Sequence, residues 1–176
     1  MLACAVLLAG CGGPGPNTRD LLVVSISDQA LALYQDNQLI RVYPVSTSRY
    51  GVGNRADSNR TPLGWMEVAR KVGDGARPGT VFRARRATGE MSPLDGGEED
   101  LVLTRILWLD GTESRNRNTM GRYIYIHGTN QESRIGRPSS QGCVRMTSAD
   151  IIDLYDRVDL RARVYVTTQR LASPDG

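Results

Sequence analysis

The sequence predicts one mainly β domain with one or two short helices, and three observations point to this fold class. Between residues 21 and 45, apolar residues lie in short runs separated by polar turns, a pattern typical of strands. Apolar or alternating stretches recur at 65–72, 101–109, 123–127 and 163–168. Only residues 147–158 show the spacing of an amphipathic helix.

The first three strands are expected at residues 21–26, 30–34 and 39–45. Asp36 and Asn37, between the second and third, suit a tight hairpin turn because both residue types tolerate a left-handed backbone.

Two segments are expected to be loops. Residues 46–62 are polar and predict a loop. Residues 73–100, rich in glycine, proline and charge, predict a long loop with one short strand at 81–84, and we expect it to act as a lid or substrate wall.

The helix has a predicted start and a predicted buried face. Thr147 is expected to cap its N-terminus, with Asp150 three positions on. Four apolar residues then share one face: Ile151, Leu154, Tyr155 and Val158. A last strand at 163–168 and a tail at 169–176 complete the chain, so the folded domain is expected to cover residues 21–168.

The N-terminus has the pattern of an export signal. Its apolar run is shorter than the roughly 20 residues of a membrane span. Leu8-Ala9-Gly10-Cys11 resembles a bacterial lipobox, so we expect residues 1–11 to be a lipoprotein signal, Cys11 to carry lipid and residues 12–20 to be a flexible tether. The usual positively charged leader is missing, so we expect the natural start to lie further upstream. An ordinary secretory signal cleaved near Gly10, or a disordered apolar tail, remains an alternative.

Composition and export together limit the function classes. The expected location is the periplasm or cell envelope, on a bacterial membrane through the lipid anchor. The net charge of +3 comes from dispersed arginines, with Arg83, Arg85 and Arg86 as one small cluster. This pattern does not predict a nucleic-acid partner, but it suits an anionic cell-wall polymer. We expect a monomer.

One histidine and one cysteine carry the predicted chemistry. Cys143 is the only cysteine outside the first eleven residues, so it has no partner for an intramolecular disulfide once the signal is removed. His127, the only histidine, precedes it by 16 positions. Because a thiol needs a base or a positive neighbour to become a nucleophile, the pair suggests a catalytic thiol and its base.

Other interpretations of these residues are weaker. A lone cysteine is most often a small buried hydrophobe, and a lone histidine after a strand is most often structural. Zinc usually takes three or four ligands, so no metal site is expected. A serine nucleophile at Ser139 or Ser140 lacks the Gly-x-Ser-x-Gly turn, and a thiol-redox protein would need a Cys-x-x-Cys pair.

Four stretches resemble one known family. Ser140-Gln141-Gly142-Cys143-Val144-Arg145 resembles the S-x-G-C-[IV]-R signature of the L,D-transpeptidase (YkuD-like) catalytic domain, and His127-Gly128-Thr129 resembles its H-G-T element. Residues 27–48 and 60–64 resemble its opening strands and its T-P-x-G element. The resemblance covers roughly residues 21–168. One departure is Gln141, where many members have a histidine, so His127 is the only imidazole available.

The resemblance implies a fold, a nucleophile and its helpers. The fold is a β-rich sandwich or barrel-like sheet. Cys143 attacks an amide carbonyl, and His127 takes and returns the proton. A backbone carbonyl at or just after Gly128 orients the imidazole, and N–H groups of Gly142 and Cys143 stabilise the oxyanion. No metal or organic cofactor is implied.

The resemblance also implies a substrate and an inhibitor class. The substrates are peptidoglycan stem peptides, and carbapenem-type β-lactams acylate Cys143. Arg145 is implied to bind a substrate carboxylate, with a structural role in the loop as the alternative. Ser140 and Tyr125 are further candidates for substrate contact, although Ser140 could instead hydrogen-bond the turn. The acceptor could be a stem amine, water or a protein lysine, and a non-catalytic wall-binding lipoprotein remains the other alternative.

Overall fold

The structure is a computed structural model that describes residues 19–171. The expected signal, the lipidated Cys11, most of the tether and residues 172–176 of the tail lie outside the described residues. The strands are β1 (Asp20–Ser25), β2 (Ala30–Gln35), β3 (Gln38–Pro44), β4 (Gly64–Val72), β5 (Thr80–Arg83), β6 (Arg86–Met91), β7 (Val102–Gly111), β8 (Tyr125–Gly128), β9 (Val144–Met146) and β10 (Arg163–Thr167). The helices are α1 (Ser148–Arg157) and the short 3-10 helix η1 (Glu132–Arg134). The predicted mainly β fold class is therefore confirmed.

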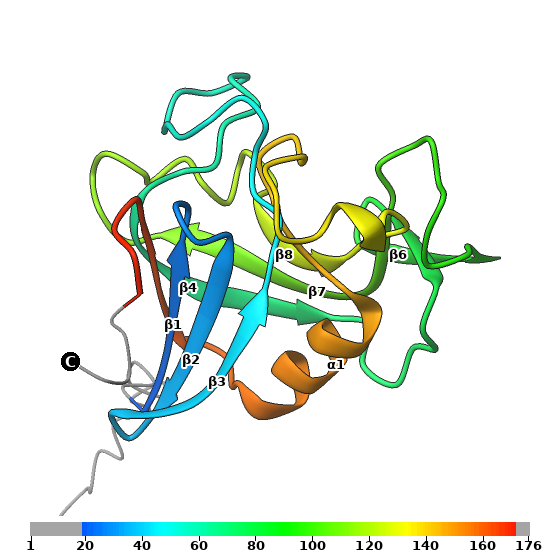
Figure 1. Ribbon diagram of the computed structural model, residues 1–176, viewed down its shortest axis with the longest axis horizontal. Helices are drawn as coiled ribbons and strands as arrows, with labels where there is room; N and C mark the ends of the chain where they lie inside the picture. Colours follow the sequence, from blue (N-terminus) through cyan, green and yellow to red (C-terminus); the bar gives the residue numbers. More distant parts are fainter. Residues whose placement is uncertain (1–18, 172–176) are drawn as a thin grey trace, which may run out of the picture.

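The strands form one mixed sheet in the order β3-β2-β1-β10-β4-β7-β5-β6, and β8 links β7 to β9. Figure 1 shows β1 to β3 running across the direction of β4 and β7, so the sheet bends over the helix. The helix α1 contacts β7 and β8. The main core, which includes Leu22, Val68, Ile126, Val144 and Leu154, fills the space inside this bend.

Two local predictions are confirmed at single residues. Asp36 and Asn37 have φ angles of 49° and 64°, the left-handed values that a two-residue hairpin requires. Thr147 caps α1: the Asp150 N–H donates to Thr147 Oγ1 at 3.1 Å, and Thr147 Oγ1 donates to Asp150 Oδ2 at 2.9 Å. Polar side chains with short reach thus set the turn and the helix start.

The segment 73–100 differs from its prediction. It contains a hairpin of β5 and β6, closed by Ala84 and Arg85 with φ angles of 48° and 64°, instead of one isolated strand. Strand β5 pairs with β7 and anchors the hairpin, whereas all six residues of β6 are exposed. Because β6 is held by backbone pairing and buries no apolar face, its sequence carries no alternating pattern.

Candidate active site

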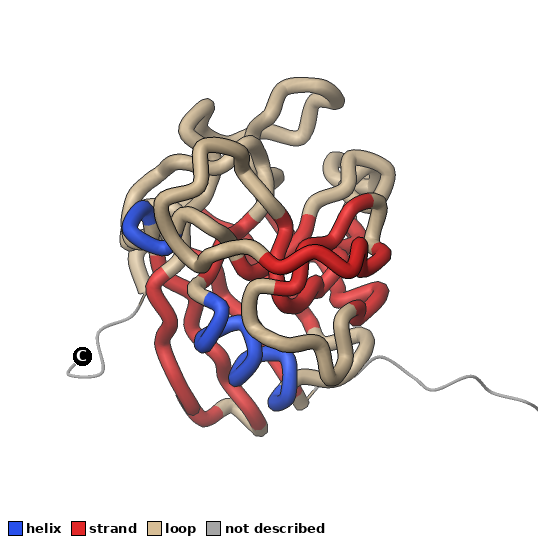
Figure 2. Tube along the Cα trace, turned by 90° about the vertical axis from the view of Figure 1, so that its right-hand side faces the viewer, coloured by secondary structure: helices blue, strands red, loops and turns tan. Residues whose placement is uncertain are grey.

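Figure 2 shows the long loops gathered at one end of the molecule, and hydrogen bonds join parts of the stretches that resemble the family. The Ser46 N–H donates to the Arg145 carbonyl at 2.9 Å, and the Arg145 N–H returns a bond to the Ser46 carbonyl at 2.8 Å. Thr61 Oγ1 donates to the Gly142 carbonyl at 3.1 Å and accepts the Ser48 N–H at 3.0 Å. The early loop therefore fixes the backbone on both sides of Cys143.

His127 and Cys143 lie on the same face of neighbouring strands. Strands β8 and β9 are parallel, and Ile126 pairs with Val144 while His127 pairs with Arg145. Because side chains alternate between faces, Ile126 and Val144 point into the main core, and His127 and Cys143 point to the opposite side. The 16 positions that separate the two residues in sequence are spanned by the crossover between β8 and β9.

The backbone fixes the tautomer of His127. Its Nδ1 lies 2.7 Å from the carbonyl oxygen of Gly128, and the side chain is only 3% exposed. A carbonyl oxygen can only accept, so Nδ1 carries the proton and Nε2 presents the lone pair. Gly128 makes this close turn possible, because a Cβ there would lie 2.8 Å from the Leu103 carbonyl oxygen. Burial lowers the pKa of His127 below its ordinary value, against the opposing field of Asp100.

The thiol of Cys143 rests between two backbone groups. Sγ donates to the Tyr123 carbonyl at 3.4 Å and accepts the Tyr125 N–H at 3.4 Å. Burial raises the pKa of the Cys143 thiol to about 12, while the Tyr125 N–H, Arg145 and Arg122 favour the thiolate. Asp100 and Arg145 act on the pKa values of both Cys143 and His127, which places the two groups in one electrostatic environment. The lowered pKa of His127 and the raised pKa of Cys143 both favour the neutral form of each group.

The turn before Cys143 corrects two expectations. Gly142 has φ +122°, a left-handed value that glycine tolerates, so it does provide the sharp turn. Its N–H, however, donates to Ser140 Oγ at 3.2 Å and is not free for an oxyanion. Ser140 is fully buried and donates to the Cys143 carbonyl at 2.6 Å. Ser140 therefore holds the turn and is not placed to contact substrate.

Arg145 is also corrected. Its side chain is 0% exposed, and Nη1 donates to Asp100 Oδ1 at 2.9 Å and to Gln131 Oε1 at 2.8 Å. Nη2 donates to Ser139 Oγ. Nη1 and Nη2 are thus bonded to neighbouring loops, and Nε is buried without a hydrogen-bond partner. Because the whole guanidinium is covered, the structural alternative describes Arg145 in this structure. Asp100 and Gln131 were missed in the sequence because they end or follow polar loop segments with no motif of their own.

We expect Arg145→Ala to lower the free energy of unfolding by about 3–5 kcal/mol. The substitution leaves the Asp100 carboxylate, whose side chain is only 21% exposed, without its ion-pair partner. Arg157→Ala is the matched control. Its ion pair with Asp153 is partly exposed, at 41% and 27%, so its loss should destabilise the protein far less than the loss of Arg145. Urea unfolding followed by circular dichroism measures both, and equal losses in the two variants would contradict the structural role of Arg145.

Aromatic residues form the wall beside the thiol. Tyr125 is 8% exposed, and its ring meets Trp108 edge-on at 5.8 Å and His127 edge-on at 6.4 Å between centroids. Tyr123 stacks on Trp108 at 5.9 Å. Tyr125 thus lies beside Cys143 and His127 as expected of a site residue, and its backbone N–H contacts the thiol directly.

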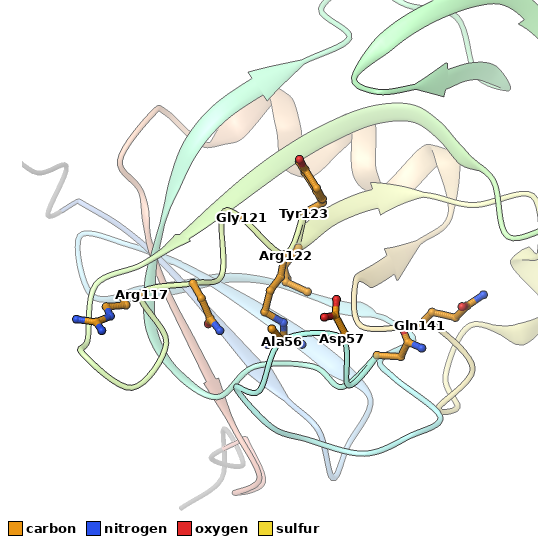
Figure 3. Close-up of a pocket in the computed structure, with 10 residues that line it drawn as sticks. Ala56, Asp57, Arg117, Gly121, Arg122, Tyr123 and Gln141 are labelled. Carbon is orange, nitrogen blue, oxygen red and sulfur yellow. The ribbon is translucent and has the colours of Figure 1, made fainter.

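Two cavities flank the turn at Gln141. One of about 460 Å³ is lined by Asp57, Arg122 and Gln141 among others (Figure 3). The other, of about 500 Å³, is lined by Asp100 and Gln131 together with Gln141. Gln141 immediately precedes Gly142-Cys143, so a ligand can approach the turn from either side. In Figure 3 the side chain of Tyr123 points away from Asp57 and Arg122.

A buried imidazole on β8 and a thiol just before β9, on the same face, are the side-chain types that acyl transfer through a cysteine requires. The profile of the L,D-transpeptidase catalytic domain (YkuD) matches residues 19–166. The chain therefore belongs to the L,D-transpeptidase catalytic domain family, as the motifs indicated.

Related proteins agree with this assignment. The YqjB protein of Bacillus subtilis (strain 168), provisionally named an L,D-transpeptidase, is 27% identical over 147 residues, which are 83% of this chain and 70% of YqjB. "Probable L,D-transpeptidase ErfK/SrfK" of Escherichia coli (strain K12) is 26% identical over 171 residues, 92% of this chain. The chain spans only 49% of that relative.

Solved structures show the same fold. An L,D-transpeptidase from Mycobacterium smegmatis superposes with a TM-score of 0.57 at 18% identity, covering 85% of this chain and 58% of that one. L,D-transpeptidase 3 from Mycobacterium tuberculosis, in complex with a faropenem-derived adduct, gives a TM-score of 0.53 at 18% identity, covering 86% and 60%.

Proposed function

We propose that this protein is a peptidoglycan L,D-transpeptidase that acts through a thioester on Cys143. The observation that carries the proposal is the placement of the Cys143 thiol on the same face as the His127 imidazole, whose Nδ1 is held by the Gly128 carbonyl, inside a domain of this family. The donor is a tetrapeptide stem, and the acceptor is an amine on a neighbouring stem.

The first half of the reaction forms the thioester. The thiol leaves the Tyr123 carbonyl and turns toward His127, since catalytic hydrogen bonds often form only with substrate bound. Sγ attacks the carbonyl carbon of the donor's L-centre while its proton moves to Nε2. Of the two expected oxyanion donors, the Cys143 N–H remains. The C–N bond then breaks, and Nε2 returns the proton to the departing D-alanine amine.

The second half resolves the thioester. The acceptor amine attacks the thioester carbon, His127 takes the amine proton, and the C–S bond breaks as Sγ regains a proton. The product is a 3→3 cross-link. Cavities on both sides of Gln141 support separate approaches for donor and acceptor. Water as acceptor gives a carboxypeptidase, and a protein lysine gives attachment of a protein to the wall.

Two further parts of the proposal concern inhibition and location. Related structures hold imipenem or a faropenem-derived adduct, which supports acylation of Cys143 by β-lactams of these kinds. The lipobox-like Leu8-Ala9-Gly10-Cys11 supports a lipid-anchored protein of the cell envelope. Within residues 19–171, no helix is long and apolar enough to cross a membrane.

Mass spectrometry of the products tests the proposal. Purified disaccharide-tetrapeptide is incubated with the protein from Asn17 onward, and with its Cys143→Ala variant. A cross-linked dimer that has lost one alanine, absent with the variant, is the expected result. A tripeptide without dimer would instead indicate the carboxypeptidase. The absence of any product, together with no covalent carbapenem adduct, would overturn catalysis and leave a wall-binding protein.

A further inference from the structure

The site needs a cation that Arg145 does not supply. The proposed donor ends in a carboxylate, yet the Arg145 guanidinium is buried and bound to Asp100. The arginine cluster of the sequence lies on the hairpin of β5 and β6, and its middle member, Arg85, occupies the turn with φ 64°.

Arg85 extends over the aromatic wall of the site. The central carbon of its guanidinium lies 4.8 Å from the ring centroid of Trp108 and 5.0 Å from that of Tyr123. Its Nη1 donates to the Tyr125 hydroxyl at 3.4 Å. Aromatic faces hold a guanidinium plane while leaving other N–H groups at its edge available. The cation is thus positioned before any ligand arrives.

The same aromatic residues hold the nucleophile. The Tyr123 carbonyl and the Tyr125 N–H are the two groups bonded to Cys143 Sγ. Arg85 is therefore separated from the thiol by a single aromatic side chain. Tyr125 contacts Cys143 through its backbone N–H and Arg85 through its hydroxyl, so one residue connects the thiol to the cation.

The charge of Arg85 is not neutralised by a neighbour. Among residues 19–171, no carboxylate lies within ion-pair distance of it, whereas Arg83 pairs with Glu99 at 3.9 Å and Arg145 pairs with Asp100 at 2.9 Å. It contacts the hydroxyl of Tyr125 and the rings of Trp108 and Tyr123. A cation in this setting gains from an incoming anion with no ion pair to break.

We propose that Arg85 is a specificity-determining residue that binds a carboxylate of the donor stem peptide and so positions the attacked carbonyl over Cys143. The inference rests on the proposed function and names a contact of that same site. The carboxylate has two possible sources: the C-terminal carboxylate of the departing residue, or the side-chain carboxylate of the residue at the L-centre.

Steady-state kinetics with two donors tests the proposal. Tetrapeptide donor and its C-terminal amide are compared in wild type, Arg85→Ala, Arg85→Lys and the control Arg86→Ala, whose side chain is exposed on the same hairpin. We expect Arg85→Ala to lower kcat/KM by about 10- to 100-fold, the loss of one charged hydrogen bond, mainly through KM. Arg85→Lys should recover part of the loss, and Arg86→Ala should change kcat/KM less than about twofold.

The amide identifies which carboxylate is bound. If it is the C-terminal one, wild type loses a similar factor on the amide, and Arg85→Ala shows little further loss. If Arg85 binds the side-chain carboxylate, the C-terminal amide lowers kcat/KM by the same factor in wild type and in Arg85→Ala. A donor amidated at that side chain then lowers kcat/KM in wild type and has little further effect in Arg85→Ala. If the effects of Arg85→Ala and of amidation on kcat/KM are independent for both amidated donors, carboxylate binding by Arg85 is overturned.

Alkylation of Cys143 by iodoacetamide checks that the variant site is intact, because this uncharged reagent needs no carboxylate contact. Equal alkylation rates in wild type and Arg85→Ala are expected. Equal kcat/KM in these two proteins would overturn the inference alone. A wild type that processes neither donor would overturn the proposed function, and this inference with it.

Discussion

Cys143→Ala is expected to reduce acyl transfer by about 10⁴- to 10⁶-fold, the range found when a catalytic nucleophile is removed. The thiol is the only group of the described site on the special turn after Gly142, and Ser139 and Ser140 cannot replace it. Ser140 is fully buried and bonded to the Cys143 carbonyl, so its hydroxyl already serves the loop.

The variant is also expected to fold normally. Cys143 is half-buried at the margin of the smaller apolar cluster, and its thiol makes two long contacts of 3.4 Å to Tyr123 and Tyr125. Alanine fills the same backbone position, so we expect a change in unfolding free energy within about 1 kcal/mol. A large loss of stability would show that the thiol has a structural role, and the loss of activity could then result from unfolding.

Rapid-mixing mass spectrometry with imipenem measures the first step directly. Wild type should gain the mass of one β-lactam on the peptide that contains Cys143, and the variant should gain none. Transfer assays with the tetrapeptide donor then test the whole reaction. Persistent acylation of Cys143→Ala would mean that another residue is the nucleophile.

The rate of acylation should be level through neutral pH and fall on acidification. His127 accepts the thiol proton only when it is neutral, and burial keeps its pKa below the ordinary value of about 6.5. The rate therefore falls about tenfold per pH unit below that pKa, and it does not fall between pH 7 and 8. The acid limb reports the imidazole, because the thiol, with a pKa of about 12, stays protonated throughout.

His127→Gln should change the shape of this profile as well as its height. At pH 7 we expect a rate about 10²- to 10⁴-fold lower, since glutamine can hydrogen-bond but cannot take the proton. With no base, only the thiolate attacks. Because burial raises the pKa of the thiol, the thiolate is a minor species at pH 7, and the variant's rate should keep rising tenfold per unit toward high pH.

An alternative is a thiolate–imidazolium pair in the resting enzyme. Ultraviolet absorbance distinguishes the two, because a thiolate absorbs where a thiol does not. The difference spectrum between wild type and Cys143→Ala at pH 7 should show no thiolate band. A clear band that disappears on acidification would support the ion pair and contradict the neutral pair inferred from the buried environment.

Local features of this protein could be predicted because neighbouring residues determine them. The turn at Asp36-Asn37 and the cap at Thr147 depend on short-range geometry, and both are found where expected. The apolar runs located most strands because burial of one face imposes its period on the sequence. The exposed hairpin strand β6 was missed, since no burial imposes a pattern on it.

The nucleophile and base were indicated by residue type alone, because a single histidine and a single cysteine outside the first eleven residues leave few alternatives. From the sequence, the group that orients the imidazole could be narrowed only to a backbone carbonyl at or just after Gly128. The structure shows that it is the Gly128 carbonyl itself, at 2.7 Å from Nδ1.

The surroundings of Arg145 and Arg85 depended on the tertiary structure. In the sequence Arg145 follows the nucleophile by two positions, but the sheet register turns it inward onto Asp100, a residue 45 positions away. Arg85 lies far from Cys143 along the chain, and the pairing of β5 with β7 brings it onto the wall of the site. The sequence by itself determined the family and the fold class and indicated His127 and Cys143 as the candidate reactive residues, since these depend on local patterns and rare residue types. Which charges are buried and which face the substrate depended on contacts between distant segments, which no local pattern encodes.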